Sequence, residues 1–162
     1  MKGSDRFDWC REQRRGIRLV KPSISVCEAY LAKSESALNV LVSAREKDEP
    51  DWVVTTAYYA KYFALYAVLA RCGIKCEIHA CTLTAAERLL VDNGLMAKQL
   101  HEDILEAKDL RVEMQYYAYQ SYDKNAVTRQ AGSSPDFVLA MRALTERLDE
   151  RTIDKVRERV SS

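Results

Sequence analysis

The feature that most restricts the fold of this chain is an apolar stretch with no polar face, from about Trp52 to Cys72. Its centre, residues 57–70, reads AYYAKYFALYAVLA. A helix that is apolar on all sides is central in a bundle, lies in a subunit interface or crosses a membrane. The stretch is long enough to span a bilayer, but the charge of Lys61 near its middle argues against a span. We therefore predict a central helix and no membrane segment.

Tyrosines recur along this predicted helix with a spacing of four. Tyr58, Tyr62 and Tyr66 therefore share one helix face. Such an aromatic stripe is typical of a core or an interface. The alternative is a platform on which nucleic-acid bases stack.

Few residues in the chain favour turns. Only 5 Gly and 3 Pro occur among 162 residues, fewer than a β-rich protein needs. The length suits a single domain. We expect an all-α fold over residues 25–162, an antiparallel up-and-down bundle of four to five helices. The other predicted helices run over Val26–Glu46, Cys81–Asn93, Met96–Tyr122 and from Ser134-Pro135 to about Val160.

Helix-end signals place some of these boundaries. Ser25 with Glu28, and Thr84 with Glu87, have the form of capping boxes. Asp51 suits an N-cap. Residues 123–133 read as a polar loop.

The first 24 residues form a basic N-terminal arm, rich in arginine and interrupted by Gly16 and Pro22. A solvated leader or short helix is the plain interpretation. An arm that contacts nucleic acid is the alternative.

Charge and cysteine content restrict the function classes. The chain has 25 Lys+Arg against 24 Asp+Glu, which excludes a globally basic nucleic-acid binder. Five cysteines are an odd number, so we expect no closed disulfide framework and reduced thiols. No apolar export signal follows Met1, and we expect a cytoplasmic protein.

Four side chains that can bind metal lie within ten residues: Cys72, Cys76, His79 and Cys81. Their spacing matches no common zinc framework. Reduced cysteines also act as small apolar residues near helix ends. The cluster is therefore a weak metal candidate, and we predict neither a metal nor a cofactor.

The predicted helix 96–122 carries an arginine within its apolar stripe. Arg111 follows Leu100, Ile104 and Ala107 with alternating spacings of four and three. A guanidinium in such a place needs acceptors, or it faces a cleft that binds phosphate or carboxylate. The acids available for a structural pairing are Glu28, Glu35 and Glu87. On one continuous helix Tyr122 would share the face of Arg111, whereas Tyr116 would lie about 140° away. His101 would lie at the surface.

Three segments together resemble the HEPN superfamily of small helical bundles. They are Thr56-Ala57-Tyr58-Tyr59-Ala60-x-Tyr62-Phe63, Gly73-Ile74-Lys75 followed by His79, and Leu110-Arg111-x-x-x-Gln115-Tyr116. The leader from Asp8 to Pro22 is similar to that of archaeal members.

The resemblance implies a homodimer, and often a toxin–antitoxin pair with a minimal nucleotidyltransferase. Several members cleave RNA without metal through an R-x4-6-H motif in the cleft between two protomers. Arg111 matches the motif arginine. Tyr116, Tyr117 and Ala118 stand where the histidine is expected, as in the non-histidine branch.

The resemblance thus suggests site residues and two function classes. Arg111 would bind phosphate, and Tyr116 would position it or accept a nucleotidyl group. His79 would join this site or make a structural hydrogen bond. The first class is a toxin-like protein that acts on RNA or nucleotides. The second is a non-catalytic helical dimer that serves as a protein-binding module.

Overall fold

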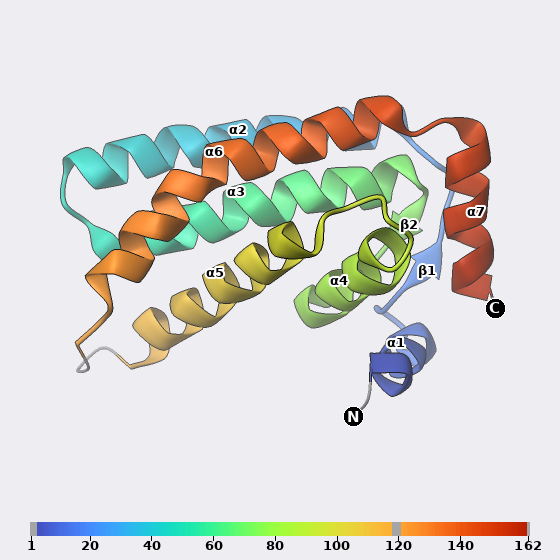
Figure 1. Cartoon of the computed structure of the whole chain (residues 1–162), viewed down its shortest axis with the longest axis horizontal. Helices are drawn as coiled ribbons and strands as arrows, with labels where there is room; N and C mark the ends of the chain where they lie inside the picture. The colour runs from blue at the N-terminus through green and yellow to red at the C-terminus, as the bar shows by residue number, and fades with distance from the viewer. Residues whose placement is uncertain (1–2, 118–120, 162) are drawn as a thin grey trace.

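A computed structural model describes residues 3–117 and 121–161. The chain is an all-α helical bundle, as predicted, with one short two-stranded sheet in the described part (Figure 1). Its elements are α1 (Gly3–Glu12), β1 (Arg18–Leu19), α2 (Ile24–Glu46), α3 (Pro50–Arg71), β2 (Ile74–Lys75), α4 (His79–Ala86), the π-helix η1 (Glu87–Val91), α5 (Lys98–Tyr116), α6 (Lys124–Arg147) and α7 (Glu150–Ser161).

The apolar helix α3 is the centre of the bundle, as its pattern predicts. It packs against α2, α5 and α6, and the colour gradient in Figure 1 shows that α2 and α5 run opposite to α3. Pro50 begins the helix, where its missing N–H has no intrahelical acceptor to lose. The expected N-cap at Asp51 is wrong by two residues, because Glu49 is the N-cap and Asp51 lies in the first turn.

The start of α2 differs from the predicted capping box. Ser23 is the N-cap, and its Oγ accepts a hydrogen bond from the backbone N–H of Val26 at 3.2 Å. The predicted box of Ser25 and Glu28 is therefore wrong, since Ser25 already lies inside the helix.

The predicted helix 81–93 begins earlier and ends differently. It begins at His79, and the π-helix η1 follows after Ala86. Thr84 is not a cap, because its hydroxyl lies inside α4 and donates to the carbonyl of Ala80. The helical residues end at Val91, two before the predicted end at Asn93. Gly94 follows with a φ of +69°, and the Asn93 amide donates to the carbonyls of Arg88 and Leu89.

The chain after α5 departs most from expectation. Helix α5 ends at Tyr116, and Ser121 and Tyr122 are not helical. Ala118, one of the residues that stand where the motif histidine is expected, lies outside the described residues. The prediction of a polar loop over residues 123–133 is wrong, because Asp123 is the N-cap of α6. Its Oδ1 accepts hydrogen bonds from the backbone N–H groups of Asn125 and Ala126. Pro135 therefore lies inside α6, although Ser-Pro favours a helix start.

The basic arm is packed onto the bundle. Phe7, Cys10 and Ile17 are buried, and β1 pairs antiparallel with β2. These contacts exclude the interpretation of residues 7–19 as a solvated leader. The division of the chain at residue 24 into arm and bundle stays a prediction.

A disulfide joins Cys10 of α1 to Cys81 of α4. The expectation that all the thiols are reduced is therefore wrong in this structure. The pairing joins residues 71 positions apart, so only the tertiary fold brings them together. Cys27, Cys72 and Cys76 remain free and buried.

The single helix predicted from Ser134-Pro135 to about Val160 is in fact the end of α6 and a separate helix α7, which closes one end of the molecule (Figure 1). The apolar side chains of Ile153, Val156 and Val160 are buried, and α7 contacts η1 and β1. Over the described residues, no helix is both long enough and apolar enough for a membrane span.

Candidate functional site

One face of α3 carries a continuous row of aromatic rings. Tyr58 and Tyr62 are buried, whereas Tyr59 and Phe63 are partly exposed. The ring centroids of Tyr58 and Tyr62 are 5.7 Å apart, and those of Tyr59 and Phe63 are 5.5 Å apart. The spacing of three and four residues predicts this row, because such residues share a helix face.

His79 begins α4 and lies against this row. Its ring is parallel to that of Tyr62, with the centroids 4.1 Å apart. Its Nδ1 is 3.1 Å from the hydroxyl oxygen of Tyr58. The side chain is exposed, yet partial desolvation where its ring packs against the tyrosines, together with the charge of Arg111, lowers the pKa of His79. Its imidazole is therefore neutral at pH 7 and has the protonation state of a general base.

Arg111 reaches the same tyrosines from α5. Its guanidinium carbon lies 4.7 Å from the ring centroid of Tyr58 and 5.6 Å from that of Tyr59. Its Nη1 donates to the hydroxyl of Tyr59 at 3.4 Å. The side chain is partly buried, so aromatic faces stabilise the charge of Arg111.

Within residues 3–117 and 121–161, no acid pairs with this arginine. Among the described residues, Arg111 makes no ion pair, and its Nε is buried without a hydrogen-bond partner. The structural pairing with Glu28, Glu35 or Glu87 is wrong, and Glu35 instead pairs with Arg142. A buried N–H donor without an acceptor is unfavourable. No acid among the described residues therefore neutralises the charge of this guanidinium.

These residues form one group, which we call the Tyr58 cluster: Tyr58, Tyr59, Tyr62, His79 and Arg111. Arg111 and His79 both contact Tyr58. Burial raises the pKa of Tyr58 to about 12, so its hydroxyl stays protonated at pH 7. The cluster thus combines a charged anion-binding group with a neutral imidazole. This combination suits the binding of a phosphate ester and proton transfer next to it.

Tyr116 lies apart from the contacts that define the cluster. It ends α5, and 76 % of its surface is exposed. The neighbouring Gln115 donates to the hydroxyl of Thr55, which fixes the end of α5 on α3. The predicted shared face of Arg111 and Tyr122 is wrong, because α5 ends before Tyr122.

The cysteines and histidine considered for metal are used in other ways. Cys81 is in the disulfide, and Cys76 donates from Sγ to the carbonyl of Ile78. Burial raises the pKa of the Cys72 thiol to about 12, which disfavours the thiolate that binds metal. No group of three or more metal-binding side chains occurs within residues 3–117 and 121–161.

Two buried polar side chains have roles that the sequence reasoning missed. His101 is buried, not at the surface, and its Nε2 lies 3.0 Å from the carbonyl oxygen of Leu83. Lys61 is fully buried, and its Nζ lies 2.7 Å from Asp103, 2.5 Å from Gln130 and 2.8 Å from Ser133. For Lys61, the sequence contained a signal: a lysine within an apolar helix indicates buried polar partners, because a buried charge requires them.

Comparison with known proteins adds one result. The family model of the HEPN domain matches residues 27–154. This range includes the whole Tyr58 cluster and leaves out α1. A search of curated proteins finds no match to the chain.

Proposed function

This chain belongs to the HEPN domain family, and from that premise we propose that its Tyr58 cluster binds a phosphate of RNA or of a nucleotide. The observation that carries the proposal is the guanidinium of Arg111. It is partly buried, lies on two tyrosine rings, makes no ion pair in the described chain and has an unpartnered Nε.

A phosphate ester supplies what this guanidinium lacks. Phosphate oxygens accept paired hydrogen bonds from the planar guanidinium, and the charges attract. On α3, the partly exposed ring of Tyr59 contacts Arg111, and the partly exposed ring of Phe63 stacks on Tyr59. They offer apolar surface for a base or ribose of the same ligand.

A second candidate function is RNA cleavage without a metal. The position of a neutral His79 beside Tyr58 and near Arg111 favours it. The imidazole would take the proton of a ribose 2′-hydroxyl. The 2′-oxygen would then bond to the adjacent phosphorus as the bond from phosphorus to the 5′-oxygen breaks, and the 5′-oxygen would take a proton from water. Arg111 would stabilise the negative charge that develops on the phosphoryl oxygens.

The proposal about partners rests on membership of the HEPN domain family. We propose a cytoplasmic homodimer that is the toxin-like member of a pair with a minimal nucleotidyltransferase. The exposed phenol of Tyr116 would be an acceptor in that pair. Its oxygen would lose its proton to water and bond to the α-phosphorus of a nucleoside triphosphate, and the bond to pyrophosphate would break. Light scattering that gives a monomer mass at micromolar protein would reject the homodimer.

The test of the proposed function is binding of a fluorescein-labelled single-stranded RNA, measured by anisotropy. Arg111→Met removes the charge and keeps an apolar side chain, and we expect a loss of affinity of about tenfold or more. Arg88→Met is the matched control, since Arg88 is exposed and pairs with Asp92 away from the cluster. It should change the affinity by less than about twofold.

Each outcome separates the candidate functions. Equal affinity for the wild type and Arg111→Met would reject the phosphate site. Cleavage of the RNA in the presence of EDTA, lost in His79→Gln, would support the ribonuclease function. Binding of RNA without cleavage would support a nucleic-acid-binding protein without ribonuclease activity. No RNA or nucleotide binding by the wild type would favour the protein-binding module.

A further inference from the structure

We propose that the Cys10–Cys81 disulfide is a redox control on the Tyr58 cluster: the oxidised pair fixes the first turn of α4, and with it His79, in the binding geometry, and reduction releases it. The inference rests on the proposed function, because it describes the regulation of the same site.

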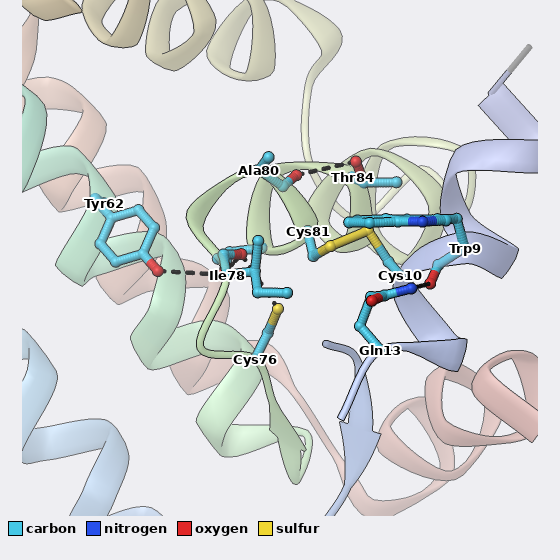
Figure 2. Close-up of a disulfide and its surroundings, with 10 residues drawn as sticks. Trp9, Cys10, Gln13, Tyr62, Cys76, Ile78, Ala80, Cys81 and Thr84 are labelled. Atoms are coloured by element: carbon cyan, nitrogen blue, oxygen red, sulfur yellow. Dashed lines mark hydrogen bonds between the residues drawn. A yellow bond between two sulfur atoms is a disulfide. The ribbon is translucent and has the colours of Figure 1, made fainter. Parts of the chain in front are cut away.

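The position of the disulfide connects α1 to the site. Cys81 lies two residues after His79, in the first turn of α4. Its partner Cys10 comes from α1, a helix that packs mainly on α4. Figure 2 shows the disulfide between these two helices, with the indole ring of Trp9 lying beside it. The bond thus ties the turn that contains His79 to the N-terminal helix.

The first turn of α4 depends on side chains for its position. Its N-cap, Ile78, provides no side-chain cap. The hydroxyl of Thr82 donates to the carbonyl of Ile78 at 3.3 Å and lies 3.1 Å from the hydroxyl of Tyr62. Cys76 also donates to this carbonyl. Because Tyr62 stacks on His79, a shift of this turn changes the geometry of the cluster.

Helix α1 has weak support once the crosslink is removed. It has ten residues, and isolated helices of this length are unstable in water. Among residues 6–12, its buried side chains are Phe7 and Cys10, so few apolar contacts hold it on α4. Both cysteines of the bond are buried. A thiol reagent therefore reaches them only when α1 moves away from α4.

The exchange needs a small-molecule disulfide such as oxidised glutathione. The Cys10 thiolate attacks one of its sulfurs, forms a mixed disulfide and releases one glutathione thiolate. The Cys81 thiolate then displaces the second glutathione, and the Cys10–Cys81 bond forms. Two electrons pass from the protein to glutathione, and the two cysteine protons end on the two glutathione thiols. A reducing cytoplasm favours the open form, and oxidative conditions favour the closed form.

The experiment compares the full chain in oxidised and reduced glutathione. A thiol count on the denatured protein should give three free thiols in the oxidised protein and five in the reduced protein, because three cysteines stay free in the structure. The labelled RNA should bind about fivefold more tightly to the oxidised protein, at the low end of typical couplings between sites. Cys10→Ser should bind like the reduced wild type under both conditions. Cys27→Ser, which removes a buried free thiol, should respond like the wild type.

A second measurement does not depend on RNA. NMR of the His79 ring protons should show different chemical shifts in the two redox states, and Cys10→Ser should match the reduced state. Five thiols in oxidised glutathione, or identical His79 signals and RNA affinities in both states, would overturn the inference. If the His79 signals change but neither state binds RNA or nucleotide, the redox coupling stands and the proposed function fails.

Discussion

The rings of His79 and Tyr62 are parallel within 9°, and their centroids are 4.1 Å apart. The Tyr62 hydroxyl lies 3.1 Å from that of Thr82, so the ring under His79 is fixed. Tyr58 contacts the imidazole at Nδ1, and Arg111 lies over the ring of Tyr58. The protonation of His79 is thus set by groups from α3 and α5, since partial desolvation and the charge of Arg111 lower its pKa.

The first prediction concerns this pKa. Arg111→Met should raise the pKa of His79, because it removes a positive charge that disfavours the imidazolium. An NMR titration of the ring protons measures the change, and His101→Gln assigns the signals, because these are the two histidines of the chain. Arg88→Met should leave the pKa unchanged. A lower pKa in Arg111→Met would contradict this electrostatic interpretation.

The same group predicts a pH dependence of stability. In the folded chain the pKa of His79 lies below its ordinary value of 6.5. Between the folded pKa and 6.5, the unfolded chain binds more protons than the folded chain. The free energy of unfolding therefore rises with pH in this interval, and it decreases as the pH falls below 6.5. Urea titrations at pH 7.5 and 5.5 should show a smaller loss for His79→Gln than for the wild type. An equal loss in both proteins would assign the effect to other groups.

The buried Lys61 supports a prediction about stability. Lys61→Ala should lower the free energy of unfolding by about 3–5 kcal/mol, because it leaves the polar groups of Asp103 and Gln130 without their partner. Lys98→Ala is the control, since Lys98 is exposed and makes a surface pair with Glu102. It should lower the free energy by less than about 1 kcal/mol. Equal urea midpoints for the two variants would contradict a structural role of the buried pair.

Lys61 also shows how far the sequence leads. The apolar pattern around it predicts α3 and its central place, because burial on all sides leaves no polar stripe. The partners of Lys61 are 42 to 72 positions away, on α5 and α6, and no local pattern identifies them. For the same reason, the sequence does not show that Cys10 pairs with Cys81 or that Arg111 contacts the tyrosines of α3. The pattern shows that Arg111 lies on an apolar face, but not what it contacts.

Local signals fail where packing overrides them. The Ser134-Pro135 pair predicts a helix start, yet α6 continues through it. The buried side chains before it, Ala126, Val127, Gln130 and Ala131, pack towards the bundle. Their burial outweighs the hydrogen bond that a proline removes from a helix.

Pro135 gives a direct test of this balance. Because it lacks an N–H, it cannot donate to the carbonyl of Ala131, and its side chain is exposed. Pro135→Ala restores this donor and should raise the free energy of unfolding by about 1–3 kcal/mol. The gain should not exceed the difference in helix propensity between proline and alanine, because the unfolded chain gains conformational freedom when proline is removed. Thermal unfolding followed by circular dichroism measures it. A lower melting temperature would show that the proline stabilises α6.

The last prediction concerns the turn after α3. Gly73 and Gly94 both have a φ of +69°, so alanine at either position should cost about 1–2 kcal/mol in backbone strain. At Gly94 an added Cβ meets nothing within 4 Å. At Gly73 it meets Arg157 and the backbone oxygen of Val20, at 2.5 Å from that oxygen.

Gly73→Ala should therefore have a free energy of unfolding about 1–3 kcal/mol lower than that of Gly94→Ala, as at other overpacked sites. The guanidinium of Arg157 donates to the carbonyls of Val20, Cys72 and Gly73, so a displaced backbone also loses these bonds. Urea titrations of the two variants measure the difference. Equal losses would show that the turn can move away from the added methyl group, and that α7 does not hold β1 and the end of α3 as closely as these contacts require.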